Sequence, residues 1–342
     1  MNIFNAALRV VICFGFLFSV SAQHRNAGTV NYQHLLMNYD ARSIGMGGAD
    51  VAMPSAINGI YTNPALLALV KKREAFIGYQ LIVDGIWCAP LAYAQPSQKL
   101  DNGAFAATIQ GLSSGKLDVT DISPEGEPVY TGYTAHNEYM TAGFSYARSF
   151  MNSRFIAGAT LKGVYQRISA PPEVYSSKGI ALDLGIQYRW FHERLIIGAA
   201  VRNAGIELQQ FKDDDVYPFP LLIEAGISYV PRYFTAVRLA ADINKVRGEY
   251  VNVEPGIEIS LYPDVLFLRF GYMFSTYDFK EKMKSFIGDD DPDYIKTNWN
   301  TLSAGVGIQT KIDNVFVDVN FGMQFHIVWF SPSPMLSAVV EF

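Results

Sequence analysis

From residue 74 to the C-terminus, hydrophobic and polar positions alternate with a period of two, which is the period of a β-strand. The alternation is clearest over residues 251–261 and 315–325, where apolar residues share one face and polar residues share the other. Side chains spaced in this way point alternately to opposite sides of a sheet. The pattern predicts about fourteen strands, an even number as bacterial barrels require. We place them at residues 74–82, 85–95, 103–112, 138–149, 153–168, 178–189, 194–203, 220–229, 234–244, 251–261, 265–274, 300–310, 315–325 and 335–342.

The lengths of the connections between these strands also alternate. Connections that follow even-numbered strands are short, as at Met151-Asn152 and Pro263-Asp264. Those that follow odd-numbered strands are mostly long, although the first hairpin at Val83-Asp84 is short; the long ones are residues 113–137, 204–219 and 275–299. A soluble β-sandwich has no reason to sort its loops in this way, whereas a transmembrane barrel has short periplasmic turns and long outer loops. We therefore predict an all-β fold, a transmembrane antiparallel β-barrel in the cell outer membrane.

A membrane-spanning helix is not predicted. Two windows, residues 51–70 and 319–340, carry no charge over about twenty residues, but both contain prolines and the second alternates polar with apolar residues. Without a helix, a closed sheet is the remaining way to cross hydrocarbon, because lipid cannot satisfy an open sheet edge. The chain also ends on Phe342 after an amphipathic stretch, which is typical of the last strand of an outer-membrane barrel.

The N-terminus predicts export from the cytoplasm. Residues 1–22 resemble a secretory signal, with Arg9 ahead of the apolar run Val10–Phe18 and small residues at Val20-Ser21-Ala22. The alternative is a retained anchor helix, but the apolar run is short for a membrane span. We expect three parts: a signal peptide at 1–22, an N-terminal lumenal plug segment at 23–73, and the barrel at 74–342.

Composition agrees with a barrel and narrows the range of partners. The chain has 342 residues, 14% of them aromatic, which suits aromatic girdles at two membrane interfaces. A net charge of -5 argues against a nucleic-acid partner, because phosphate binding needs a basic surface. Outer-membrane lipids and lipopolysaccharide are the expected surroundings. Cys88 is the one cysteine after the predicted signal, so no internal disulfide is expected.

The polar face of the predicted strands would line the lumen of the barrel. It carries charges of both signs, which predicts internal ion pairs and a blocked lumen, since an ion-selective pore would show rings of one sign. The residues on this face are Lys162, Asp183, Gln187, Arg202, Glu224, Arg238, Asp242, Glu254, Glu258, Arg269, Asp318 and Glu341.

The segment before the first strand is apolar and rich in glycine. Gly45, Gly47 and Gly48 would allow close approach of backbones and unusual dihedral angles. Asn63-Pro64 marks a turn after which Ala65 can begin a short apolar helix. A segment this apolar must pack against something, and the interior of the barrel is the available place.

These residues carry a resemblance to a known family. The run Ala41–Ala49, followed by Asn63-Pro64-Ala65, resembles the opening of the PorV/PorQ group, relatives of the FadL-type long-chain fatty acid transporters. Weaker matches are residues 181–185, 201–205, 268–272 and 302–307. The resemblance implies a monomeric barrel with its N-terminal segment folded into the lumen. It does not separate PorV from PorQ.

The resemblance also implies a function. PorV/PorQ-like proteins are outer-membrane components of type IX protein secretion, so the chain would dock cargo C-terminal domains or subunits of the surface attachment complex. The alternative is a FadL-like transporter of hydrophobic small molecules. Aromatic residues in the predicted outer loops are candidate partner contacts, unless they form the aromatic belt of the barrel. These residues are Tyr130, Tyr133, Tyr217, Phe219, Trp329 and Phe330.

No catalytic, metal or cofactor site is predicted, and the chain is not expected to be an enzyme. The glycines near residue 47 lack the Lys-Ser/Thr of a phosphate loop, and the histidines are scattered singly. A barrel enzyme such as a lipase would need a nucleophile motif that we do not find. Two acidic runs, 213–215 and 289–293, lack the order of a calcium loop and are expected to be solvated, with divalent bridging to lipopolysaccharide as the alternative.

Overall fold

A computed structural model describes residues 30–83, 85–97, 103–123, 126–151, 153–211, 217–249, 251–263, 265–275, 301–326 and 332–342. The predicted signal peptide, both acidic runs and the loop residues Trp329 and Phe330 lie outside these residues.

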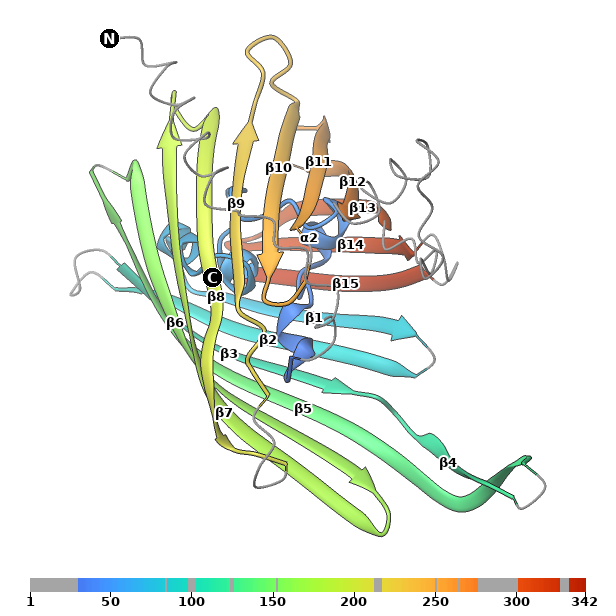
Figure 1. Cartoon of the computed structure of the whole chain (residues 1–342). Coiled ribbons are helices and arrows are strands. Elements are labelled where there is room, and N and C mark those ends of the chain that lie inside the picture. Colours follow the sequence, from blue (N-terminus) through green and yellow to red (C-terminus); the bar gives the residue numbers. More distant parts are fainter. Residues whose placement is uncertain are drawn as a thin grey trace, which may run out of the picture.

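The described residues contain fifteen β-strands, drawn in Figure 1. Their bounds are β1 (Glu74–Val83), β2 (Ile86–Ser97), β3 (Gly103–Ser113), β4 (Leu117–Ile122), β5 (Pro128–Phe150), β6 (Phe155–Ala170), β7 (Glu173–Trp190), β8 (Leu195–Gln209), β9 (Leu222–Tyr229), β10 (Val237–Val246), β11 (Val251–Tyr262), β12 (Leu266–Ser275), β13 (Thr301–Ile312), β14 (Val315–His326) and β15 (Pro332–Glu341).

The sheet closes on itself. Strand β15 pairs antiparallel with β1, and β3 pairs antiparallel with β5, whereas β4 pairs only with β5. Leaving β4 aside, the remaining fourteen of the fifteen strands form a continuous antiparallel ring. The predicted closed barrel of fourteen strands is therefore confirmed.

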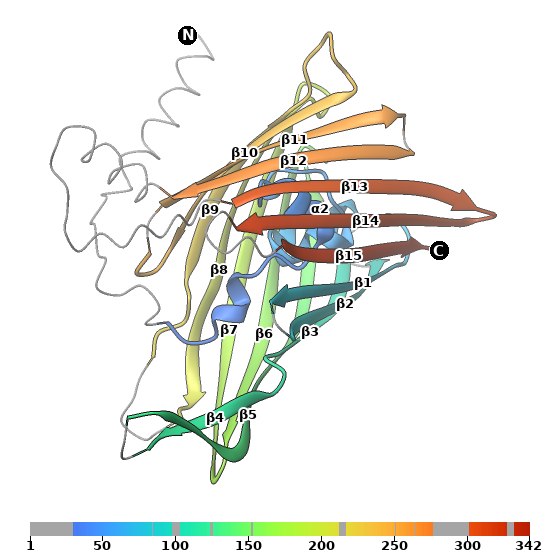
Figure 2. The same ribbon diagram turned by 90° about the vertical axis from the view of Figure 1, so that its right-hand side faces the viewer.

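Two predicted outer loops are partly strands, and those predictions were wrong. Residues 113–137 contain β4 and the first part of β5, which form a two-stranded ribbon beyond the ring (Figure 2). Both faces of this ribbon are largely exposed, so no alternation of polar and apolar residues marks it. Strand β8 continues to Gln209, although a loop was predicted from residue 204. A β-bulge breaks its alternation, because Arg202 and Asn203 both face inward.

The two faces of the ring differ as the alternation predicts. Large apolar side chains such as Ile77, Leu161 and Leu302 are exposed on the outer face, as a surface that meets hydrocarbon requires. Of the twelve polar residues predicted to line the lumen, Arg238 and Glu341 are half-buried and the others are buried. The polar face of the strands is therefore the inner face.

The lumen is filled by the N-terminal segment, which we call the plug (residues 30–73). Its short helices lie inside the ring of strands in both views (Figures 1 and 2). None of the helices in the described part of the chain has the length and apolar character that a membrane span needs. The helices are η2 (Gln33–Leu36), α2 (Ala41–Gly45), η3 (Ile57–Tyr61) and η4 (Pro64–Leu69).

The largest apolar core lies between the plug and one side of the barrel. Helices η3 and η4 pack against inward-facing residues of β1, β2, β3, β5 and β6, including Phe76, Cys88 and Ile156. This side of the lumen is therefore closed by apolar contacts, whereas the opposite side is closed by charged groups and by contacts between backbones.

Candidate functional site

The predicted glycine motif places the plug backbone directly against the barrel wall. Gly45 is the last residue of α2, and Gly47 and Gly48 have φ angles of 71° and 96°, which glycine adopts readily. A Cβ on Gly47 would lie 2.6 Å from the Tyr272 backbone nitrogen. The motif therefore allows the close backbone approach that the sequence predicted.

The Asn63-Pro64-Ala65 motif connects the plug to a different strand. The Asn63 Nδ2 donates to the carbonyl oxygens of Val51 (2.9 Å) and Ile186 (3.1 Å), and its Oδ1 accepts from the Ala65 backbone nitrogen (3.0 Å). The last contact caps η4, with Pro64 in its first turn. One side chain thus fixes the start of η4, the preceding plug turn and β7.

Inward-facing glycines of the barrel complete the seal, and of these the sequence pattern had indicated only Gly271, within the weaker match at residues 268–272. At each of them a Cβ would fall within 2.5 Å of a plug backbone atom, so only glycine leaves room for the plug. Their nearest plug atoms are the Pro64 oxygen for Gly158 (2.4 Å), the Val51 oxygen for Gly198 (2.2 Å), the Met46 oxygen for Gly256 (2.5 Å), the Met46 carbonyl carbon for Gly271 (2.1 Å) and the Ala41 oxygen for Gly322 (2.2 Å).

Charged groups of the lumen also hold the plug. Glu258 accepts from the Arg42 side chain at 3.0 and 2.9 Å and from Arg269 Nε at 2.8 Å. Arg202 donates to the Tyr61 carbonyl oxygen (2.8 Å) and pairs with Glu224 (3.1 Å). The mixed charges of the lumen therefore form internal pairs, as predicted, and some of the partners belong to the plug.

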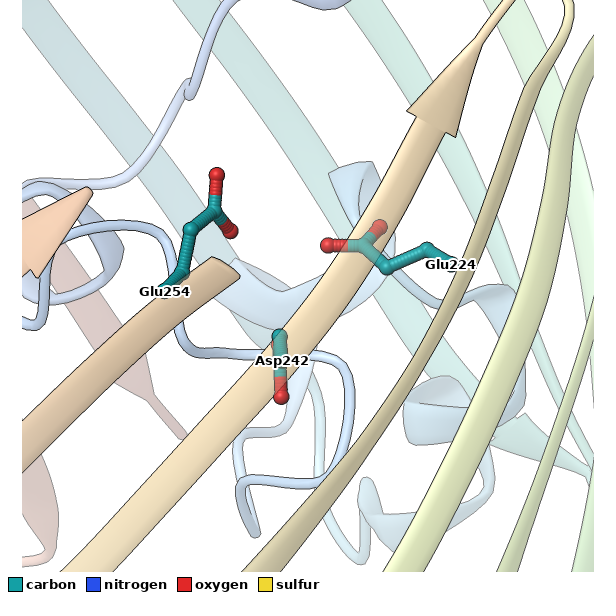
Figure 3. Close-up of side chains that lie close together, drawn as sticks. All are labelled: Glu224, Asp242 and Glu254. Carbon is teal, nitrogen blue, oxygen red and sulfur yellow. The ribbon is translucent and has the colours of Figure 1, made fainter. Parts of the chain in front are cut away.

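Three buried carboxylates, Glu224, Asp242 and Glu254, come together from β9, β10 and β11 (Figure 3). One oxygen of each lies within 4.8 Å of the others, close enough to share a cation. Each group already has a protein donor, because Asp242 accepts from the backbone nitrogens of Asp50 (2.7 Å) and Val51 (2.8 Å), Glu224 from Arg202, and Glu254 from Asn244 (2.8 Å). We therefore interpret the cluster as an attachment point for the plug and assign no ion to it.

Inside the plug, Asp50 is a second polar anchor. It accepts from the hydroxyls of Ser55 (3.2 Å) and Thr62 (3.0 Å). Burial raises the pKa of the Asp50 carboxyl to about 6, nearby Asp40 adds to the rise, and Arg42 opposes it.

The barrel wall has a gap on the outer half of β8. The last pair between β8 and β9 is Arg202 with Leu222, so β8 beyond this point pairs with β7 alone. A cavity of about 390 Å³ lies in the gap, and we call it the wall pocket. It is lined by Leu161, Ile180, Ala181, Leu182, Asn203, Ala204, Gly205, Ile206, Phe219, Leu221 and Arg247.

The wall pocket opens on the outer face of the barrel and ends at buried side chains. Ile180, Leu182 and Ile206 belong to the outer, hydrocarbon-facing surface, whereas Asn203 and Phe219 are buried inside. Most of the lining side chains are aliphatic, which suits an apolar ligand. The pocket therefore offers a place between the membrane and the plug.

Asn203, at the β8 bulge, ties the wall pocket to the plug. Its Nδ2 donates to the carbonyl oxygens of Leu35 (3.4 Å) and Pro220 (3.3 Å), and its Oδ1 accepts from Lys162. It has a φ of 61°, which asparagine tolerates better than most residues. Asn203 therefore contacts both the wall pocket and the plug.

The residues predicted to contact partners differ in their exposure. Tyr130 and Tyr133 are exposed on the β4–β5 ribbon, and Tyr217 is exposed in the segment before β9. Phe219 is only 2% exposed, so its prediction as a partner contact was wrong. Its ring packs inward against Tyr32, with ring centroids 4.7 Å apart.

No protein-family model and no curated protein sequence matches the chain. Solved structures do match it. The toluene transporter TodX of P. putida has a TM-score of 0.61 at 13% identity, covering 89% of this chain and 99% of that one.

Two further solved structures are similar. The toluene transporter TbuX of Ralstonia pickettii has a TM-score of 0.56 at 15% identity, covering 89% of this chain and 97% of that one. A FadL homologue of Pseudomonas aeruginosa has a TM-score of 0.52 at 11% identity, covering 89% and 98%. These comparisons give no support to the narrower PorV/PorQ assignment. They show that the chain has the closed antiparallel β-barrel fold of these proteins.

Proposed function

We propose that the chain carries small hydrophobic molecules across the outer membrane, and that these molecules pass through the wall pocket. The observation that carries this proposal is the pocket itself, an apolar cavity in the barrel wall with hydrocarbon-facing residues on one side and Phe219 on the other. A molecule dissolved in the membrane would reach it without crossing water.

The plug also favours entry of the ligand from the side of the barrel. Because backbone contacts and ion pairs fill the lumen, a route straight down the axis would require the whole plug to leave. The wall pocket reaches the plug from the side. Proteins with this fold include two named as toluene transporters, which favours the transporter alternative over protein secretion.

Filling the wall pocket is expected to reduce uptake of an apolar probe. Ala204→Phe places a ring in the pocket, and Ala199→Phe places the same ring on the outer face of the same strand away from it. With radiolabelled naphthalene as the probe and cells carrying the full chain in their outer membrane, we expect Ala204→Phe to slow uptake roughly tenfold. Ala199→Phe should match the unmodified chain. Equal uptake by all three, at the level of cells without the chain, would contradict the proposal.

The prediction that the outer loops bind cargo C-terminal domains or attachment-complex subunits stays a prediction. Tyr130 and Tyr133 on the exposed ribbon are the described residues available for such contacts. A pull-down from membranes that recovers secretion proteins would favour it.

A further inference from the structure

A short strap, residues 218–221, closes the gap where β8 has no pair with β9. The Asn31 backbone nitrogen donates to the Pro218 oxygen (3.1 Å), and the Arg247 backbone nitrogen donates to the Leu221 oxygen (2.8 Å). The Asn203 side chain donates to the Pro220 oxygen at 3.3 Å. The strap is thus attached by single hydrogen bonds to the plug, β8 and the end of β10, where a strand would be held by a ladder.

Phe219 lies at the centre of the strap and points inward. Its ring sits in a socket made by two glycines, since a Cβ on Gly179 or Gly205 would lie 2.5 or 2.6 Å from the ring. On its inner side the ring contacts Tyr32 of the plug, and the same apolar cluster includes Ala181. The Phe219 ring therefore separates the wall pocket from the plug.

We propose that Phe219 is a removable seal between the wall pocket and the plug, and that it is the residue that limits the size of the ligand. This inference rests on the proposed function. A ligand that enters the wall pocket would have to push the ring from its glycine socket, and the strap that carries the ring can shift without breaking a strand pair.

The volume of the wall pocket indicates the class of ligand. Cavities of about 150 Å³ hold benzene, and drug-sized ligands occupy about 300–1,000 Å³. The wall pocket, at about 390 Å³, falls at the lower end of that range. It fits a compact apolar molecule of one or two rings better than an extended acyl chain.

A buried cysteine behind the ring provides the test. Val164→Cys, in a Cys88→Ser background, places a thiol at a site that is 4% exposed, belongs to the same cluster as Phe219 and does not line the wall pocket. The full chain is placed in lipid vesicles and treated with N-phenylmaleimide, which dissolves in the bilayer. We expect Phe219→Ala to speed labelling about tenfold, because the buried ring no longer covers the thiol. Tyr217→Ala removes an exposed aromatic two residues away and should leave the rate unchanged.

Equal rates with Phe219 and with Phe219→Ala would overturn the proposal. If Phe219→Ala fails to fold, judged by loss of heat-modifiable gel mobility, Phe219→Leu replaces it. With leucine only partly filling the socket, the labelling rate should rise about threefold. An unchanged labelling rate would overturn the seal. Faster labelling without any naphthalene uptake would sustain the seal and refute the transport function. Naphthalene uptake with unchanged labelling would overturn the seal and sustain the transport function.

Discussion

Gly271→Val is expected to turn the closed barrel into a conducting pore. A Cβ at this position would lie 2.1 Å from the Met46 carbonyl carbon and 2.2 Å from the Gly47 nitrogen, backbone atoms that no rotamer change can move. Overpacking of this kind costs about 1–3 kcal/mol, which lowers the equilibrium constant for plug docking by roughly 10- to 100-fold. Single-channel recording in planar bilayers measures the result, and we expect open events that the unmodified chain lacks.

Gly163→Val is the matched control for this prediction. Gly163 also lies within a barrel strand, but a Cβ there meets nothing within 4 Å. The substitution should leave the barrel closed, because valine is a favourable strand residue. A Gly271→Val protein that folds normally and stays closed would show that the backbone contact with Met46 does not hold the plug.

Glu258→Gln is expected to produce the largest loss of stability among single lumen substitutions. The carboxylate holds Arg42 of the plug and Arg269 of the barrel, and both guanidinium groups would lose the negative charge between them. Removing one partner of a buried ion pair typically costs about 3–5 kcal/mol. Urea unfolding in lipid vesicles, followed by tryptophan fluorescence, should show a lower free energy of unfolding by about this amount.

Glu193→Gln tests whether burial of the ion pairs is the cause of the stability loss expected for Glu258→Gln. Glu193 pairs with Arg189 at 2.8 Å, a distance comparable to those at Glu258, but its side chain is 56% exposed in the turn between β7 and β8. Exposed pairs contribute about 0–1 kcal/mol, so little change in unfolding is expected. Equal losses for the two variants would contradict the role of Glu258 as a buried clamp.

The barrel was predictable wherever each strand meets hydrocarbon on one side and the polar lumen on the other. Strands β11 and β14 fulfil that condition, and their predicted ends, residues 261 and 325, lie one residue before the observed ends at Tyr262 and His326. The β4–β5 ribbon does not, because it is exposed on both faces and no alternation marks it. In β8 the bulge at Asn203 shifts the phase of the pattern, so its last residues resemble a loop.

The candidate site was less predictable, because its contacts join distant parts of the chain. The sequence indicated that Gly47 needs close backbone approach, but its contact with Tyr272 depends on how the strands are staggered around the ring. Likewise, Tyr217 and Phe219 are neighbouring aromatics in one predicted loop. Only the glycine socket on β7 and β8 makes Phe219 a buried residue and leaves Tyr217 exposed.

The proposed transport route requires that an apolar ligand bind in the barrel wall beside the plug. A crystal structure of the full chain soaked with 1-bromonaphthalene tests it most directly, because anomalous scattering locates the bromine. We predict a single strong site among Ile180, Leu182 and Leu221, in contact with Phe219. Bromine found only on the exposed ribbon or the short turns between strands, with an empty wall pocket, would contradict binding in the barrel wall.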